Sequence, residues 1–106
     1  MGQGKRPRTE RRARERELRK EVRERERLSA AAPGGAPDRP ITVSSASVIE
    51  GQARSTPCVQ CGGELLLRDH AAAAHASESL RVVRLVCRLC HAPRALWFRI
   101  EHALPS

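Results

Sequence analysis

Two pairs of cysteines limit what this chain can fold into more than any other feature of its sequence. The 106 residues contain four cysteines in the pattern C-x2-C-x25-C-x2-C, at Cys58, Cys61, Cys87 and Cys90. A two-residue spacer lets the backbone curl until both sulfurs of a pair face one point, and structural zinc sites hold their ion with four ligands in a tetrahedron. The spacing therefore predicts one closed metal site, with one Zn2+ per chain as the expected ion and iron as the alternative in the same four-thiolate shell.

Three other uses of these cysteines stay open. Cys87, Cys90 and His91 spell C-x-x-C-H, the motif by which c-type haem is attached. Disulfides would require an oxidising compartment, and a redox dithiol would require a βαβ setting that the sequence does not indicate. Haem attachment and disulfides both require export, and the first twelve residues lack the apolar stretch of a signal peptide. The sequence therefore favours metal binding over these three uses.

The residue that follows each cysteine pair suits a left-handed backbone conformation. Gly62 and Gly63 follow the first pair, and glycine adopts a positive φ at no steric cost while leaving its amide free to approach a sulfur. His91 takes the equivalent position after the second pair, and histidine is one of the few other residues enriched in that conformation. Both pairs are therefore expected to form the tight turn called a zinc knuckle.

The segment that contains the cysteines is too small to fold by burial of apolar side chains alone. It has 49 residues from Cys58 to the end, and the whole chain has one Trp, one Phe and no Tyr. Segments of this size usually need a metal or another cross-link. Structural zinc contributes about 10–16 kcal/mol of apparent binding free energy in small zinc peptides. We therefore expect the metal to decide whether this segment folds.

Three apolar segments near the cysteines have the length and composition of β-strands. Residues 64–69, 80–87 and 94–101 are rich in branched and aromatic side chains. The alanine-rich stretch 70–79, between the first two, is expected to form a helical turn or a mobile loop.

The motifs CVQCGGELLL, CRLC and RALWFRIE, which lie within residues 57–101, resemble those of the zinc-ribbon family. The resemblance implies a small zinc ribbon, a three-stranded antiparallel sheet with two zinc knuckles, whose four cysteines are the ligands. We assign residues 58–101 to this ribbon and 102–106 to a C-terminal tail. Zinc ribbons occur in transcription factors, ribosomal proteins and many small bacterial proteins, so the fold by itself implies no single function.

The first quarter of the chain is strongly charged and predicts a solvated helix. Residues 1–28 carry twelve Lys or Arg against six Glu, which gives +6 of the formal net charge of +8. The window 9–28 has no Gly or Pro, begins with a candidate N-cap at Thr9, and places several acids four residues before an arginine. Only four residues of this window are apolar, which is too few for a packed face.

A linker follows this helix. Residues 29–40 contain three Pro and two Gly, a composition that resists both helix and sheet. We expect residues 29–57 to be a flexible linker with a candidate short strand at 41–50. Such a linker would leave the charged helix tethered to the ribbon rather than docked on it.

The start of the chain holds the candidate contact with nucleic acid. Five cations are offset there only by Glu10, and they are Lys5, Arg6, Arg8, Arg11 and Arg12. Such a cluster suits electrostatic contact with phosphates, and it would order on contact. The alternative is a merely solvated helix, because the six Glu of the arm neutralise half of its cations within the helix.

These observations predict a non-enzymatic zinc-binding protein whose basic arm contacts RNA or DNA in a nucleoprotein assembly. The alternative is a zinc-stabilised protein–protein interaction module, with strand edges or Trp97 as the contact. Trp97 and Phe98 are adjacent, so a strand would direct them to opposite faces, with at least one in the core.

Several classes of function are not expected. Four cysteines fill a tetrahedral shell, and no Ser/His/Asp constellation or phosphate loop is present, so we expect no enzyme and no small-molecule substrate. The four histidines are expected on the surface; they are His70, His75, His91 and His102. No apolar run is long enough to span a membrane, and we expect a soluble, cytoplasmic protein.

Overall fold

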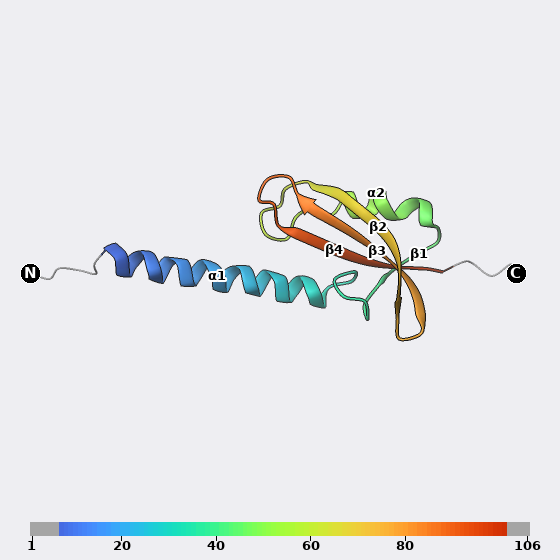
Figure 1. Ribbon diagram of the computed structural model, residues 1–106, viewed down its shortest axis with the longest axis horizontal. Helices are drawn as coiled ribbons and strands as arrows, with labels where there is room; N and C mark the ends of the chain where they lie inside the picture. The colour runs from blue at the N-terminus through green and yellow to red at the C-terminus, as the bar shows by residue number, and fades with distance from the viewer. Residues whose placement is uncertain (1–6, 102–106) are drawn as a thin grey trace, which may run out of the picture.

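A long N-terminal helix and a small sheet covered by one short helix make up the described part of the chain, residues 7–101 of a computed structural model (Figure 1). Along the chain the elements are α1 (Pro7–Ala31), β1 (Ile41–Val43), the single-turn helix η1 (Ala46–Val48), α2 (Ile49–Arg54), β2 (Leu65–His75), β3 (Glu78–Cys87) and β4 (Pro93–Ile100). Neither α-helix within residues 7–101 combines the length and the apolar content that a membrane span requires.

The predicted N-terminal helix is present as α1, which has 25 residues and is therefore about 38 Å long. It begins at Pro7, where the missing N–H of proline costs no hydrogen bond, and it ends at Ala31, three residues beyond the expected boundary. The sparse apolar residues do not form a packed face, since Leu18 and Val22 remain 55% and 45% exposed. Most of α1 is therefore solvated, as its composition predicts.

The sheet has four strands in the order β1-β4-β3-β2, so the expected three-stranded antiparallel sheet is wrong in detail. β2, β3 and β4 are antiparallel neighbours, as expected, but β1 joins the free edge of β4 in parallel. Ile41 lies opposite Phe98, and the N–H of Glu101 donates to the Val43 carbonyl at 2.8 Å. The sheet is mixed because this short segment of the expected linker covers an edge that would otherwise stay open.

The alanine-rich stretch is not a helical turn or a loop. β2 continues through it to His75, and its alanines pair with β3 from Ser79 to Val82. Ala76 and Ser77 alone make the turn, with φ of 50° and 67°. Positive φ at both central residues is the requirement of a type I′ hairpin turn. Pairing with the apolar strand β3 therefore overrides the weak strand propensity of alanine.

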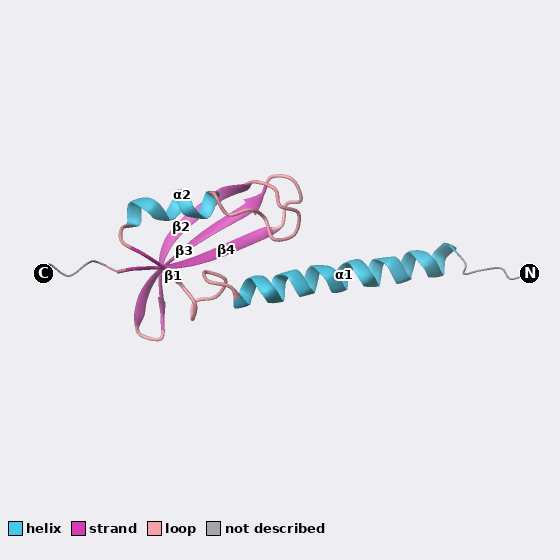
Figure 2. Ribbon diagram, turned by 180° about the vertical axis from the view of Figure 1, so that it is seen from behind, coloured by secondary structure: helices cyan, strands magenta, loops and turns pink. Residues whose placement is uncertain are grey.

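The hydrophobic core lies between α2 and one face of the sheet, on which α2 lies (Figure 2). Ile49 and Ala53 of α2 are fully buried, and so are Val83 and Phe98 of the strands. Trp97, the neighbour of Phe98, is only partly buried, which confirms that the two aromatic side chains take opposite faces. The residues between β1 and the first cysteine thus supply the helix that closes the core.

Candidate metal centre

The four cysteine sulfurs come together at one end of the sheet. All four Sγ atoms lie within 4.8 Å of one another, with Cys61 and Cys87 3.4 Å apart and Cys58 and Cys90 3.6 Å apart. A tetrahedron with Zn–S bonds of about 2.3 Å has edges of about 3.8 Å. The spacing of the sulfurs is therefore that of a four-thiolate metal site, and the predicted ligand cluster is confirmed as a cluster.

Both cysteine pairs have the same backbone hydrogen bonds. In each pair, the N–H of the first cysteine donates to the carbonyl five residues later, and the N–H four residues later donates back to the cysteine carbonyl. These bonds are Cys58 N to Gly63 O at 2.9 Å, Gly62 N to Cys58 O at 2.8 Å, Cys87 N to Ala92 O at 2.9 Å and His91 N to Cys87 O at 3.0 Å. Two equivalent knuckle turns therefore face each other.

The backbone after each pair adopts the expected left-handed conformation. Gly62 has φ of 78° and His91 has φ of 64°, so both predictions are confirmed. Gly63 is needed for a different reason, because a Cβ there would lie 3.1 Å from the sulfur of Cys87 and 3.2 Å from that of Cys61. Gly62 thus supplies the positive φ that His91 adopts in the second knuckle, and Gly63 supplies space beside the sulfurs.

Backbone amides already stabilise negative charge on these sulfurs. The N–H groups of Leu89 and Cys90 lie 3.4 Å from the Cys87 sulfur, and the N–H of Gln60 lies 3.4 Å from that of Cys58. The Cys90 N–H, together with that of Leu89, lowers the pKa of Cys87 to about 6. Thiolate is the form that binds metal, so these amides favour the ligand form of Cys87.

A cation among these sulfurs would offset the repulsion between neighbouring thiolates. The N–H of Ala92 donates to Cys90 and favours its thiolate, but reduced hydration and the neighbouring sulfurs oppose a second negative charge and raise the pKa of Cys90 to about 12. Four thiolates this close need a positive ion between them. The first cysteine of each pair, Cys58 and Cys87, is buried, and the second faces solvent. The donor set therefore fits one metal ion held half inside the core.

Three residues outside the cysteines fix α1 to this centre, a contact that the sequence does not predict. Gln60, within the first knuckle, donates from its side-chain nitrogen to the Glu26 carboxylate at 2.7 Å and to the Val22 carbonyl at 3.1 Å. Arg94, just after the second knuckle, donates to both oxygens of Glu26 at 2.9 and 2.8 Å and to Ser29 Oγ at 3.2 Å. Glu26 therefore bridges the residues next to both knuckles.

The last turns of α1 are thus docked, and the expectation of a merely tethered arm is wrong for them. Arg94 is only 8% exposed, and its hydrogen bonds hold the pKa of Glu26 below the ordinary carboxyl value. Glu26 is one of six interleaved glutamates in the arm, and no local pattern distinguishes it from the others. The composition of α1 predicts that most of the helix is solvated. It does not predict the docking contact, because that contact depends on Gln60 and Arg94, which lie far away in the sequence.

The predicted nucleic-acid residues are at the other end of α1. Arg8, Arg11 and Arg12 lie in its first turns with exposed side chains, and Lys5 and Arg6 lie outside the described residues. About 27 Å of helix separates Arg8 from Glu26. The structure therefore presents these arginines to solvent, well away from the cysteines.

His70 departs from the expected surface position. Its ring is 13% exposed, with Nδ1 2.9 Å from a Glu50 oxygen and Nε2 3.3 Å from an Arg81 nitrogen. Since arginine can only donate, Nε2 is the acceptor and Nδ1–H donates to Glu50. The ring therefore ties α2 to β2 and β3.

The chain matches no protein-family model, no curated protein and no solved structure. The assignment of a metal centre therefore rests on the geometry of the four cysteines and their two knuckle turns.

Proposed function

We propose that this protein is a non-enzymatic zinc-binding protein of the zinc-ribbon type that presents a basic helix to the phosphate backbone of a nucleic acid. The observation that carries the proposal is the bridge from Glu26 of α1 to Gln60 and Arg94. These hydrogen bonds attach the C-terminal part of α1 beside the metal centre, so that the exposed arginines of its first turns lie away from the sheet. A braced, charged helix suits contact with an extended polyanion.

Zinc is the ion that the donor set favours. Soft thiolate ligands select zinc or iron over magnesium and calcium, and four sulfurs in a tetrahedron are typical of structural zinc. When bound, the ion would supply four short bonds that join the two knuckles, with Cys58, Cys61, Cys87 and Cys90 as its ligands. A shell filled by four cysteines leaves no position for a substrate or for water. This supports a structural role for the ion and not a catalytic one.

The charge of α1 supports contact with phosphates. Within Pro7–Ala31 there are ten Lys or Arg against six Glu, and the acids are partly used within the helix. Glu15 pairs with Arg19 at 3.7 Å, and Glu24 accepts from the Arg27 Nε at 3.1 Å. These exposed pairs contribute little to stability, and the remaining cations are available to a polyanion.

The test is the salt dependence of binding. Purified protein is first assayed for one metal ion per chain by elemental analysis, and is then titrated onto a labelled oligonucleotide at several salt concentrations. Removal of residues 1–16 deletes the first cations but leaves Glu26 in place. We expect the affinity of the whole chain to fall steeply with the logarithm of salt concentration, and the truncated chain to show a flatter slope. Binding that this truncation leaves unchanged would refute the proposal.

A second candidate function, a zinc-stabilised protein-interaction module, is favoured by one observation. Leu18 and Val22 are one helical turn apart, and both are exposed on the solvated part of α1. Leu89, at the tip of the second knuckle, is 69% exposed. Exposed apolar side chains on a helix can pack against a groove in a partner. This candidate predicts partner binding that is insensitive to salt and abolished by Leu18→Asp.

A further inference from the structure

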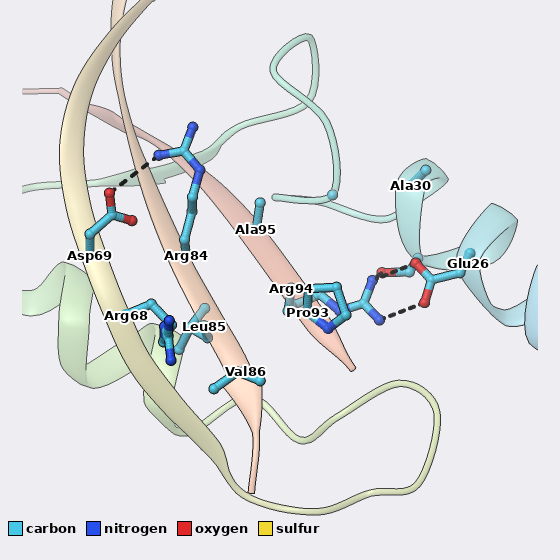
Figure 3. A pocket seen from close by; sticks show the side chains of 12 residues that line it. Glu26, Ala30, Arg68, Asp69, Arg84, Leu85, Val86, Pro93, Arg94 and Ala95 are labelled. Atoms are coloured by element: carbon cyan, nitrogen blue, oxygen red, sulfur yellow. Dashed lines mark hydrogen bonds and ion pairs between the residues drawn. The ribbon is translucent and has the colours of Figure 1, made fainter. Parts of the chain in front are cut away.

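A cavity of about 630 Å3 lies between the C-terminal end of α1 and the sheet face opposite α2 (Figure 3). Its volume is within the range of small-ligand sites. Asp69, Arg84 and Ala95 lie opposite one another on β2, β3 and β4 and line it together. Val83 and Leu85, the neighbours of Arg84, point their side chains into the core beneath α2. The cavity, hereafter the sheet groove, therefore opens on the face of the sheet opposite α2, and no cysteine lines it.

A β-bulge supplies the sheet groove with an extra arginine. The pairing of β2 with β3 shifts between Leu67 and Asp69, so that Arg68 has no partner residue on β3. In a regular strand, consecutive side chains take opposite faces. Here Arg68 and Asp69 both line the same groove. Bulges commonly redirect a side chain in this way and are frequent next to functional sites.

The charges in the sheet groove leave one arginine in excess. Arg84 lies 3.5 Å from Asp69, and Arg94 is paired with Glu26 in the opposite wall. Among residues 7–101, Arg68 has no carboxylate partner within ion-pair distance. The buried Nε of Arg94 likewise has no hydrogen-bond partner in the described part of the chain. The groove therefore has a net positive charge and suits an anion.

The floor of the sheet groove is apolar. It is formed by Val86, Pro93 and Ala95 of the strands, with Ala30 of α1 beside them. A ligand that fits such a site has a flat or apolar part against the floor and a negative group at the arginines. A nucleotide of a single strand has this combination, because its base is free to leave the stack and its phosphate is adjacent. Paired bases in a duplex cannot enter.

We propose that the sheet groove binds a single nucleic acid strand, with its phosphate at Arg68 and Arg84 and a base against the apolar floor. This inference rests on the proposed function, since it gives the polyanion a second contact in addition to the basic helix. It also predicts an effect for Asp69, because this carboxylate partly neutralises Arg84 and repels the phosphate. Removing the charge of Asp69 should therefore tighten binding, and removing the charge of Arg68 should weaken it.

The experiment uses full-length, zinc-loaded protein and a fluorescently labelled single-stranded oligonucleotide of about ten nucleotides. Three variants are compared with the unmodified protein by fluorescence anisotropy over a range of salt concentrations: Arg68→Gln, Asp69→Asn and Arg54→Gln. Arg54 is a matched control, because it is an exposed arginine on α2, on the other side of the sheet. Its substitution changes the net charge of the protein as much as Arg68→Gln does. An unlabelled duplex of the same sequence serves as competitor.

We expect Arg68→Gln to weaken binding about tenfold, the effect of one lost charge-assisted hydrogen bond, and to lower the salt slope by about one. Asp69→Asn should tighten binding severalfold, Arg54→Gln should leave it nearly unchanged, and the duplex should compete poorly.

If Arg68→Gln behaves like Arg54→Gln while the unmodified protein binds, the groove is not the site, although the proposed function stands. Equal competition by the duplex overturns the single-strand assignment. If the unmodified protein binds no oligonucleotide even at low salt, the proposed function fails, and this inference with it.

Discussion

Glu26 and Arg94 are 68 residues apart in the sequence and are joined by two hydrogen bonds of 2.9 and 2.8 Å between carboxylate and guanidinium. Arg94 is the second residue of β4, just after the second knuckle, and Gln60 of the first knuckle donates to the same carboxylate. A single acid of α1 therefore connects the helix to both halves of the metal centre. The position of the helix depends on the integrity of that centre.

Glu26→Gln should release α1 from the sheet. The substitution removes the charge that compensates Arg94, whose side chain is 8% exposed, and loss of hydrogen bonds to a charged group costs about 2 kcal/mol. Hydrogen exchange measured by mass spectrometry should show lost protection in residues 22–31. Glu24→Gln is the matched control, because Glu24 pairs with exposed Arg27 on the same helix. Equal protection in both variants would contradict docking of α1 through Glu26.

Removal of the metal should unfold the sheet and leave α1 without its support. The core contains few large side chains, and Cys58 and Cys87 belong to it, so the sulfur ligands and the core are one structure. We expect a chelator to abolish the β signal in circular dichroism and readdition of Zn2+ to restore it. A melting temperature that is the same with and without chelator would show that the sheet folds without the ion.

Gly63→Ala should lower the affinity for metal without changing a ligand. Its Cβ would lie 3.0 Å from Leu89 Cδ1 and 3.1 and 3.2 Å from the sulfurs of Cys87 and Cys61. The knuckles would have to separate to accept it, and the expected loss of affinity is at least about tenfold. Gly51→Ala is the control, since a Cβ there meets nothing within 4 Å and alanine favours a helix. Competition with a colorimetric chelator measures both, and equal affinities would contradict the prediction.

Docking of α1 should weaken in acid. The Arg94 hydrogen bond lowers the pKa of Glu26 from its ordinary value of 4.5, so ionised Glu26 stabilises the docked state above pH 4.5. This contribution is lost as the pH falls through the lowered pKa, because the carboxyl is then protonated in both states. The difference in hydrogen exchange between the unmodified protein and Glu26→Gln should therefore shrink below about pH 4.5. A difference in hydrogen exchange that grows as the pH falls would contradict this prediction.

The sequence predicts the features that depend on nearby residues. The cysteine cluster and the left-handed residues Gly62 and His91 follow from short spacing and from backbone sterics, and α1 follows from helix propensity. The turns and α1 need only residues close to one another in the chain, whereas the cluster joins two distant pairs and follows from the preference of one metal ion for four cysteine ligands. The structure confirms all three predictions.

What the sequence does not predict depends on distant partners. The candidate strand at 41–50 is confirmed for Ile41–Val43, but residues 46–54 form η1 and α2 instead, because Ile49 and Ala53 pack against the sheet. The alanines of β2 are extended because β3 pairs with them. Docking of α1 through Glu26 requires a carboxylate and a guanidinium from opposite ends of the chain. No local pattern carries such information, since propensity is a weak prior that tertiary contacts override.

The helix is attached at a second place besides Glu26. The N–H of Trp97 donates to the Gly34 carbonyl at 2.8 Å, just after α1 ends, and the Gly34 N–H is bonded to the Arg39 carbonyl. A helix held at Glu26 and again just beyond its C-terminal end is more restricted in direction than a helix held at one residue. Arg8 therefore lies far from Arg68, with about 27 Å of helix between it and Glu26. A nucleic acid that contacts both Arg8 and Arg68 must be long enough to extend from one to the other. This distance therefore sets a minimum length for a ligand that uses both sites.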